Sequence, residues 1–289
     1  MLELKIISHG MAVSLMSEMI KNEDKKKENE TEKDIERKSE EEIKQDCEIN
    51  ATKRLIKNFR EQYPRLPIRI IGDSLYPSQE IFRKLRELDI EYIFVLKDKK
   101  IPSITEEFFT LVSLPEGERF IMETKEATIL TMWANEIDYN GEKVNVIRQI
   151  RRNKEDGSNS VWMWITNREI TRMNVSKIIY CGKQRSYIEN QGFKEQKITR
   201  GIELEHVYSK NIKAIRVIYG IIQIVHLILQ IIEHSDICGD FKQKYGSVKV
   251  FEKKFYADLT KEIVNIKIIQ IKIQIHFNKS TLTYVDYTK

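Results

Sequence analysis

Cysteine is scarce in this chain, and its first residues do not have the composition of a secretion signal. The 289 residues include only three cysteines, Cys47, Cys181 and Cys238. Three thiols cannot form a fully paired disulfide framework, so we expect a reducing compartment. The first ten residues, MLELKIISHG, alternate between apolar and polar types and contain no apolar run. We therefore expect no secretion signal at this point of the sequence.

Uninterrupted apolar runs of membrane-spanning length are also missing. The most apolar stretch, from Val217 to Ile232, contains Gln223, His226 and Gln230. These three residues recur at helical spacing and place one polar stripe on an otherwise apolar helix. The pattern favours a buried core helix, from about Asn211 to His234, over a membrane span.

Apolar residues are nearly absent between Lys21 and Lys44, where charged residues predominate. Such a segment cannot bury enough surface to offset its ordering entropy, so residues 21–45 are predicted to be a charged mobile loop, with partial helix through i,i+4 charge pairs as the alternative. Residues 1–50 hold nine Lys and Arg against fourteen Asp and Glu, which leaves about +10 on the rest of the chain. A solvated lysine-rich surface is the simpler explanation of this charge alone, and a polyanionic partner is the alternative.

The order of predicted elements is that of a mixed α/β protein. Alternating apolar residues predict a hairpin of strands at 2–6 and 11–20, and helical spacing predicts a helix over 46–62. A strand at 68–71 ends at Asp73, a helix starts near Pro77, and a second strand covers 91–96.

The second half of the chain changes from strands to helices. Between 130 and 165, turn signals at Asn140-Gly141 and Asp156-Gly157 separate strands and predict a β-rich insertion. Its tryptophans, Trp133, Trp162 and Trp164, suit core packing better than base stacking. A helix that contains Arg185 and Glu189 is then predicted to end at about Gln191. Alternating isoleucines predict a late strand at 269–277.

Two carboxylates stand out, each with a simpler structural explanation. Asp73 follows a strand, at the edge where open α/β sheets place their chemistry, but a turn or helix-capping role is equally compatible with it. Glu189 lies four residues after Arg185, where an ordinary surface ion pair would place it. Spacing alone does not separate these alternatives.

Longer segments carry a resemblance. IIGDSLY at 70–76, EYIFVLKDK at 91–99, WITN at 164–167 and GKQRSYIENQGFKEQK at 182–197 are similar to segments of insertion-sequence DDE transposases. LEH at 204–206 and Ile-Gln-Ile at 273–275 resemble the end of such proteins. The resemblance covers most of residues 1–277 and implies an α/β, RNase H-like mixed sheet with flanking helices, a β-rich insertion and a helical C-terminal part.

The resemblance also implies roles for individual residues. Asp73 and Glu189 would be the second and third catalytic carboxylates, holding Mg²⁺ or Mn²⁺ for a two-metal phosphoryl transfer. Arg185 and Lys197 would contact DNA phosphates, and Asn190 is a further candidate DNA contact.

This sequence departs from the family pattern at several positions. The first catalytic Asp belongs to a central strand upstream of the segment that resembles Leu2 to Ile20, and no residue here occupies that position. Gly182 stands where a Tyr is usual, Ser186 stands where an aromatic residue is expected, and Lys197 follows Glu189 by eight residues, not seven. A chain of this kind is expected to be poorly folded, inactive, or both.

The sequence therefore predicts a transposase fragment whose intact form cleaves and transfers DNA strands at insertion-sequence ends. The alternative is a non-catalytic DNA-binding remnant or regulator. DNA is the expected partner, with a homo-oligomer when intact, no membrane, and a cytoplasmic, nucleoid-associated location. The expected parts are four: an N-terminal part of the RNase H-like domain (1–100), the insertion (101–165), the C-terminal part of that domain (166–235) and a C-terminal extension (236–289).

Overall fold

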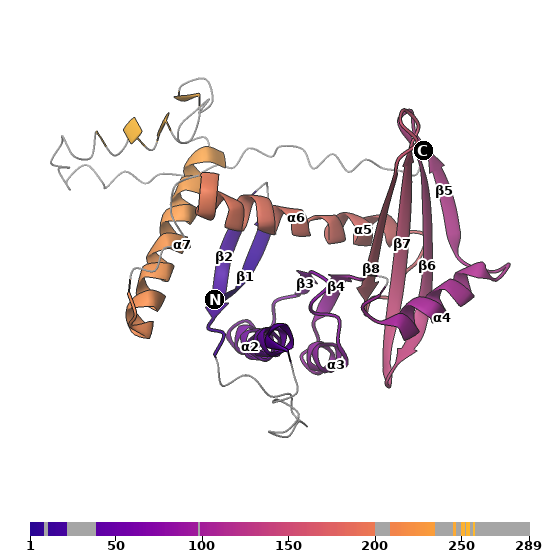
Figure 1. Cartoon of the computed structure of the whole chain (residues 1–289), viewed down its shortest axis with the longest axis horizontal. Helices are drawn as coiled ribbons and strands as arrows, with labels where there is room; N and C mark the ends of the chain where they lie inside the picture. The colour runs from indigo at the N-terminus through magenta and orange to yellow at the C-terminus, as the bar shows by residue number, and fades with distance from the viewer. Residues whose placement is uncertain are drawn as a thin grey trace. The chain divides into compact units, whose positions relative to one another are not determined.

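The structure is a computed structural model that describes residues 1–8, 11–21, 39–97, 99–199 and 209–234, with isolated positions between 245 and 257. The chain forms two compact units (Figure 1). The first comprises residues 1–4 and 16–186, and the second comprises residues 5–15 and those from 187 onward. The predicted late strand at 269–277 and the LEH segment at 204–206 lie outside the described residues.

Among the described residues, the first helix of the first unit is α2 (Glu40–Gln62), which starts earlier than the predicted residue Asp46. Ser39 caps it: the Ser39 hydroxyl accepts a hydrogen bond from the Glu42 amide, and the Glu42 carboxylate accepts one from the Ser39 amide. This reciprocal pair satisfies amides that a helix start leaves open. The end of the charged segment 21–45 is therefore helical, in line with the alternative of a partly helical segment.

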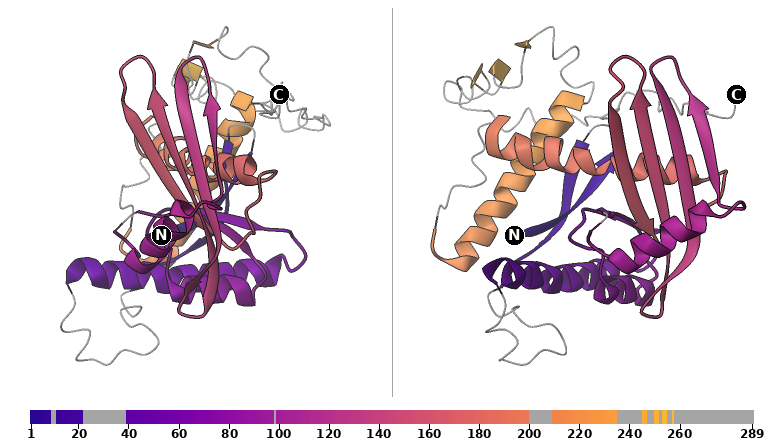
Figure 2. Two further views of the ribbon diagram at one scale, coloured as in Figure 1. Left: turned by 90° about the vertical axis from the view of Figure 1, so that its right-hand side faces the viewer. Right: turned by 45° about the vertical axis from the view of Figure 1, so that its right-hand side comes forward.

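One mixed sheet of six strands organises the first unit (Figure 2). The strand order is β3-β4-β8-β7-β6-β5, with β3 and β4 parallel and the other pairs antiparallel. The strands are β3 (Arg69–Gly72), β4 (Glu91–Val95), β5 (Arg119–Glu123), β6 (Ala127–Tyr139), β7 (Glu142–Asn153) and β8 (Asn159–Thr166). The predicted mixed α/β class is confirmed. The strands predicted as an insertion belong to the same sheet, because β8 pairs directly with β4.

The turn between β6 and β7 forms where the Asn-Gly signal predicted it. Asn140 and Gly141 have φ angles of 54° and 82°, and two successive residues with positive φ match the twist of a hairpin. The turn after β7 contains Gly157 with φ 69°. Both predicted turns are thus present.

Helices cover the two faces of this sheet. On one face, α3 (Gln79–Glu87) and α4 (Pro102–Ser113) bury Ile81, Phe82, Ile104 and Phe108. On the other face, α5 (Val175–Lys183) packs on a cluster that includes Trp133, Ile147 and Trp164. Trp133 and Trp164 are 2% exposed, which confirms the core role expected of them, whereas Trp162 is only half-buried.

The predicted N-terminal hairpin is present as β1 (Leu2–Ser8) and β2 (Met11–Glu18), a two-stranded sheet of its own. In the second unit, the hairpin residue Lys5 is 9% exposed, and its ammonium lies 3.4 Å from the Gln223 side-chain oxygen. Gln223 belongs to α7 (Ile212–His234). The helix predicted at 211–234 is therefore confirmed.

The prediction that α7 is a buried helix is wrong. Its polar stripe is buried: Gln223, His226 and Gln230 are 9%, 2% and 1% exposed. Gln223 and His226 both lie within hydrogen-bond distance of Gln196, at 2.8 and 2.9 Å. Apolar side chains on its other side are 50–62% exposed, namely Val217, Ile221, Ile224 and Ile228.

Gln223 and His226 can be buried in this way because each has a hydrogen-bond partner inside the unit, and burying them without partners would cost free energy. By length and composition, residues Ile212–Glu233 could also cross a membrane.

Candidate functional site

Asp73 stands directly after β3, as the sequence predicted. Its Oδ1 atom accepts a hydrogen bond of 2.8 Å from the Leu75 amide, so the carboxylate also has the turn-forming role that was the structural alternative. The backbone just before it is tightly enclosed. A Cβ atom added to Gly72 would lie 2.7 Å from a Tyr76 ring carbon and 2.8 Å from one of Phe94. Only glycine therefore fits the end of this strand.

The phenol of Tyr76, three residues after Asp73, is influenced by the charges of two carboxylates and one guanidinium. The Tyr76 hydroxyl donates a 3.0 Å hydrogen bond to Glu48 of α2. Burial raises the pKa of Tyr76, the charges of Glu48 and Asp73 raise it further, and Arg185 opposes them. Glu48 thus contacts the Tyr76 hydroxyl, and the charges of Asp73 and Arg185 act on it.

Two of these groups, Asp73 and Arg185, were predicted as site residues, and Glu48 was not. Glu48 lies in the middle of α2, at no spacing that distinguishes it from the helix's other acidic residues. The contact that reveals it, with Tyr76, joins positions 28 residues apart. No local pattern in the sequence carries that signal.

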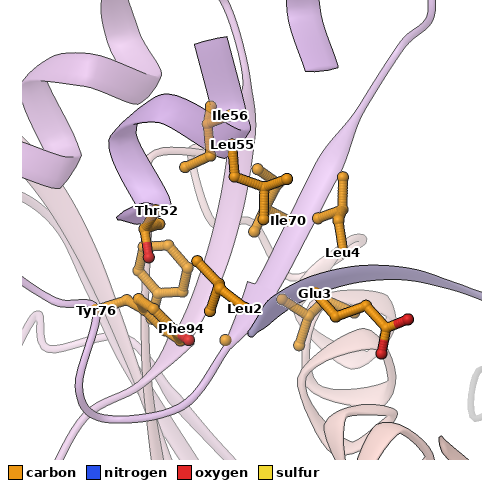
Figure 3. A pocket seen from close by; sticks show the side chains of 11 residues that line it. Leu2, Glu3, Leu4, Thr52, Leu55, Ile56, Ile70, Tyr76 and Phe94 are labelled. Carbon is orange, nitrogen blue, oxygen red and sulfur yellow. The ribbon is translucent and has the colours of Figure 1, made fainter. Parts of the chain in front are cut away.

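An apolar slot lies next to β3 (Figure 3). It is lined by the first residues of β1, by β3 itself and by α2, and the side chains of Leu2, Leu55 and Ile70 point toward it. Tyr76 and Phe94 also line it. Among the described residues, β3 has a strand partner only on its other side, where it pairs with β4. The slot thus runs along an open sheet edge that ends at Asp73.

The remaining predicted site residues belong to the second unit. Glu189, Asn190 and Lys197 lie in a π-helical segment, Ile188–Thr199, and all three are exposed. The helix predicted to end near Gln191 thus continues to Thr199. Because Asp73 and Glu189 belong to different units, their convergence on one metal ion stays a prediction.

The π-helical geometry gives a physical reason for the shifted position of Lys197. A π-helix bonds residue i to i+5 and so contains about one residue more per turn than an α-helix. An interval of eight residues from Glu189 to Lys197 then corresponds to the seven-residue interval of an α-helix, about two turns. Lys197 therefore remains a candidate phosphate contact.

Gly182, which stands where the resemblance led us to expect a tyrosine, is held close to Trp164. An added Cβ atom would lie 2.5 Å from the indole nitrogen and 2.7 Å from the neighbouring ring carbon. The close approach of α5 to β8 leaves no room for any side chain here. A tyrosine side chain would therefore not fit at this position.

We expect Gly182→Ala to lower the free energy of unfolding by about 1–3 kcal/mol, because the methyl group overpacks the α5 interface. Gly220→Ala in α7 is the matched control, since nothing lies within 4 Å of its added Cβ. That change should be neutral or stabilising by up to about 1 kcal/mol. Chemical denaturation of both variants measures this, and equal stabilities would contradict the described packing of α5.

The carboxylates do not by themselves form a complete metal site. Within the described part of the chain, no three His, Cys, Asp or Glu side chains gather closely enough to hold a metal ion. Asp73 can offer its second carboxylate oxygen, but it would need further oxygen ligands.

Comparison with known proteins agrees with the sequence resemblance. The family model described as "Transposase DDE domain" matches residues 43–221, more than half of the chain. This range contains most of α2, the six-stranded sheet, the cluster around Tyr76 and the segment with Glu189. The search of curated proteins returned no match. The protein belongs to the DDE transposase family.

Proposed function

We propose that this chain is a transposase fragment that binds DNA, and that its catalytic site is completed only by a further strand. The intact form would cleave and transfer DNA strands at insertion-sequence ends. DDE transposases use divalent metal ions, and we expect Mg²⁺ or Mn²⁺ here. We also expect the intact form to assemble as a homo-oligomer.

The slot beside β3 is the observation that carries this proposal. Its walls come from both β1 and β3, and β3 is an open edge within the described residues. A strand placed there parallel to β3 would end next to Asp73, because the carboxyl ends of parallel strands meet at one edge of the sheet. That edge is where the resemblance leads us to expect the first catalytic Asp.

The predicted residues have distinct roles in this proposal. Asp73 and Glu189 would hold the metal ion, and Arg185, Asn190 and Lys197 would contact DNA phosphates. The Arg185 guanidinium suits the phosphate role because its planar fork can donate two hydrogen bonds to one phosphate. The charges of Arg185 and Asp73 both act on the Tyr76 hydroxyl, which supports a phosphate site in the same region as the second carboxylate.

Binding can be tested separately from cutting. We expect the purified chain to bind a short duplex of arbitrary sequence, with an affinity that falls steeply as salt increases. Binding should not require Mg²⁺ and should persist in EDTA, because the phosphate contacts come from side chains. Fluorescence anisotropy measures this, and failure to bind DNA at low salt would refute the proposal.

A non-catalytic remnant that occupies transposon ends is the second candidate function. The absence of a three-ligand metal cluster among the described residues favours it. It predicts the same binding, but it gives no reason for an apolar slot along the edge of β3 that has no strand partner among the described residues. The transposase fragment is therefore better supported than the non-catalytic remnant.

A further inference from the structure

The sheet face that α5 covers extends beyond the end of that helix. Phe120, Thr131, Gln149 and Trp162 lie in register across β5, β6, β7 and β8. Directly paired residues point to the same face of a sheet, so these four form one row. Arg151, two residues after Gln149 on β7, points to the same face.

Lys183, at the end of α5, reaches over this row. Its ammonium donates a 2.7 Å hydrogen bond to the Gln149 side-chain oxygen and lies 4.6 Å from the centre of the Trp162 ring. Partial burial lowers the pKa of Lys183, and the nearby charge of Arg151 lowers it further. No carboxylate contacts this ammonium among the described residues.

A second cation lies over the other end of the row. The Arg172 guanidinium is 4.2 Å from the centre of the Phe120 ring. Arg151 does have a partner, Glu126, at 3.2 Å, but the two side chains are 45% and 82% exposed. An ion pair that is so exposed is weak and easily exchanged.

We propose that Arg151, Arg172 and Lys183, which we call the α5-side basic face, bind the phosphodiester backbone of DNA. This inference rests on the proposed function, since it names a DNA contact surface separate from Asp73 and Arg185. Three cations lie on one sheet face with one weakly held carboxylate beside them, and a phosphate backbone would supply the missing negative charge.

The geometry favours phosphate contacts over base stacking. Cations already lie over the rings of Phe120 and Trp162, so these rings are not free platforms for bases. Phosphate contacts position a protein on DNA without reading its sequence. We therefore expect the contribution of this face to be the same for every duplex sequence.

The test compares Lys183→Gln/Arg172→Gln with the wild type. Arg152→Gln is the matched control, because Arg152 is an exposed arginine beside Arg151 whose side chain points to the opposite face of β7. Binding of a short duplex of arbitrary sequence is measured at several salt concentrations. Each lost phosphate contact reduces the slope of log affinity against log salt by about 0.9.

In the double variant, the slope of log affinity against log salt should fall by about 2, and binding should weaken roughly tenfold. In Arg152→Gln, the slope should fall by less than half of that amount. Lys183→Arg/Arg172→Lys, which keeps both charges, should restore most of the binding and so exclude a purely structural effect. If the wild type binds but the double variant binds equally well, this inference is wrong and the proposed function survives. If the wild type does not bind, the proposed function fails first.

Discussion

Trp164→Ala should lower the free energy of unfolding by about 3–5 kcal/mol, among the largest effects of any single substitution in this chain. Trp164 is 2% exposed and lies between Val95 and Ile147 in the sheet register. Its indole also fills the space in front of Gly182. Removing it leaves a cavity where β4, β7, β8 and α5 meet.

Val161→Ala is the control for this substitution. Val161 lies on the same strand but is 48% exposed, so its truncation should change stability by less than about 0.5 kcal/mol. Urea denaturation followed by tryptophan fluorescence and circular dichroism compares the two variants. Similar losses for both would mean that α5 does not pack on the sheet as described.

Phe94→Ala should have a comparable effect, about 3–5 kcal/mol, on the opposite face of the sheet. Phe94 is 1% exposed and stacks on Tyr92 with a centroid distance of 4.9 Å. It also encloses Gly72 and lines the slot next to β3. The substitution therefore removes the packing that holds the end of β3, and Asp73 with it.

Phe94→Leu keeps most of the buried volume and should cost only about 1–2 kcal/mol. Thermal and chemical denaturation distinguish the two variants. A loss below about 1 kcal/mol for Phe94→Ala would show that the core beside the slot is not closely packed.

The sequence was informative wherever the signal is local. The N-terminal hairpin, the strand before Asp73 and the Asn140-Gly141 turn all follow from alternation or from residues that tolerate positive φ. α3 was also predictable, because Ile81, Phe82 and Leu85 fall at helical spacing and are buried.

Other elements depend on partners that are distant in sequence. α4 and β5 were not predicted. α4 has one short apolar stripe, with Ile104 and Phe108 as its fully buried residues, and β5 lies at the edge of the sheet, where β6 is its one strand partner among the described residues. The exposure of the apolar side of α7 depends on Gln196, which is remote from that helix in sequence.

The candidate site was predictable only in part, for the same reason. Asp73 and Arg185 were found through short motifs. Glu48 became apparent only through its hydrogen bond with Tyr76, and Lys183 only through its contacts with Gln149 and Trp162. Tertiary contacts of this kind leave no periodic signal in the sequence.

We propose that this chain binds DNA but does not by itself hold a complete set of catalytic carboxylates, and a nicking assay can decide this. Supercoiled plasmid is incubated with the purified chain in Mg²⁺ or Mn²⁺, alongside Asp73→Asn. We predict no conversion to the nicked form above background by either protein, although both bind the plasmid. Metal-dependent nicking by the wild type that Asp73→Asn abolishes would contradict the claim and show that the chain is a complete enzyme.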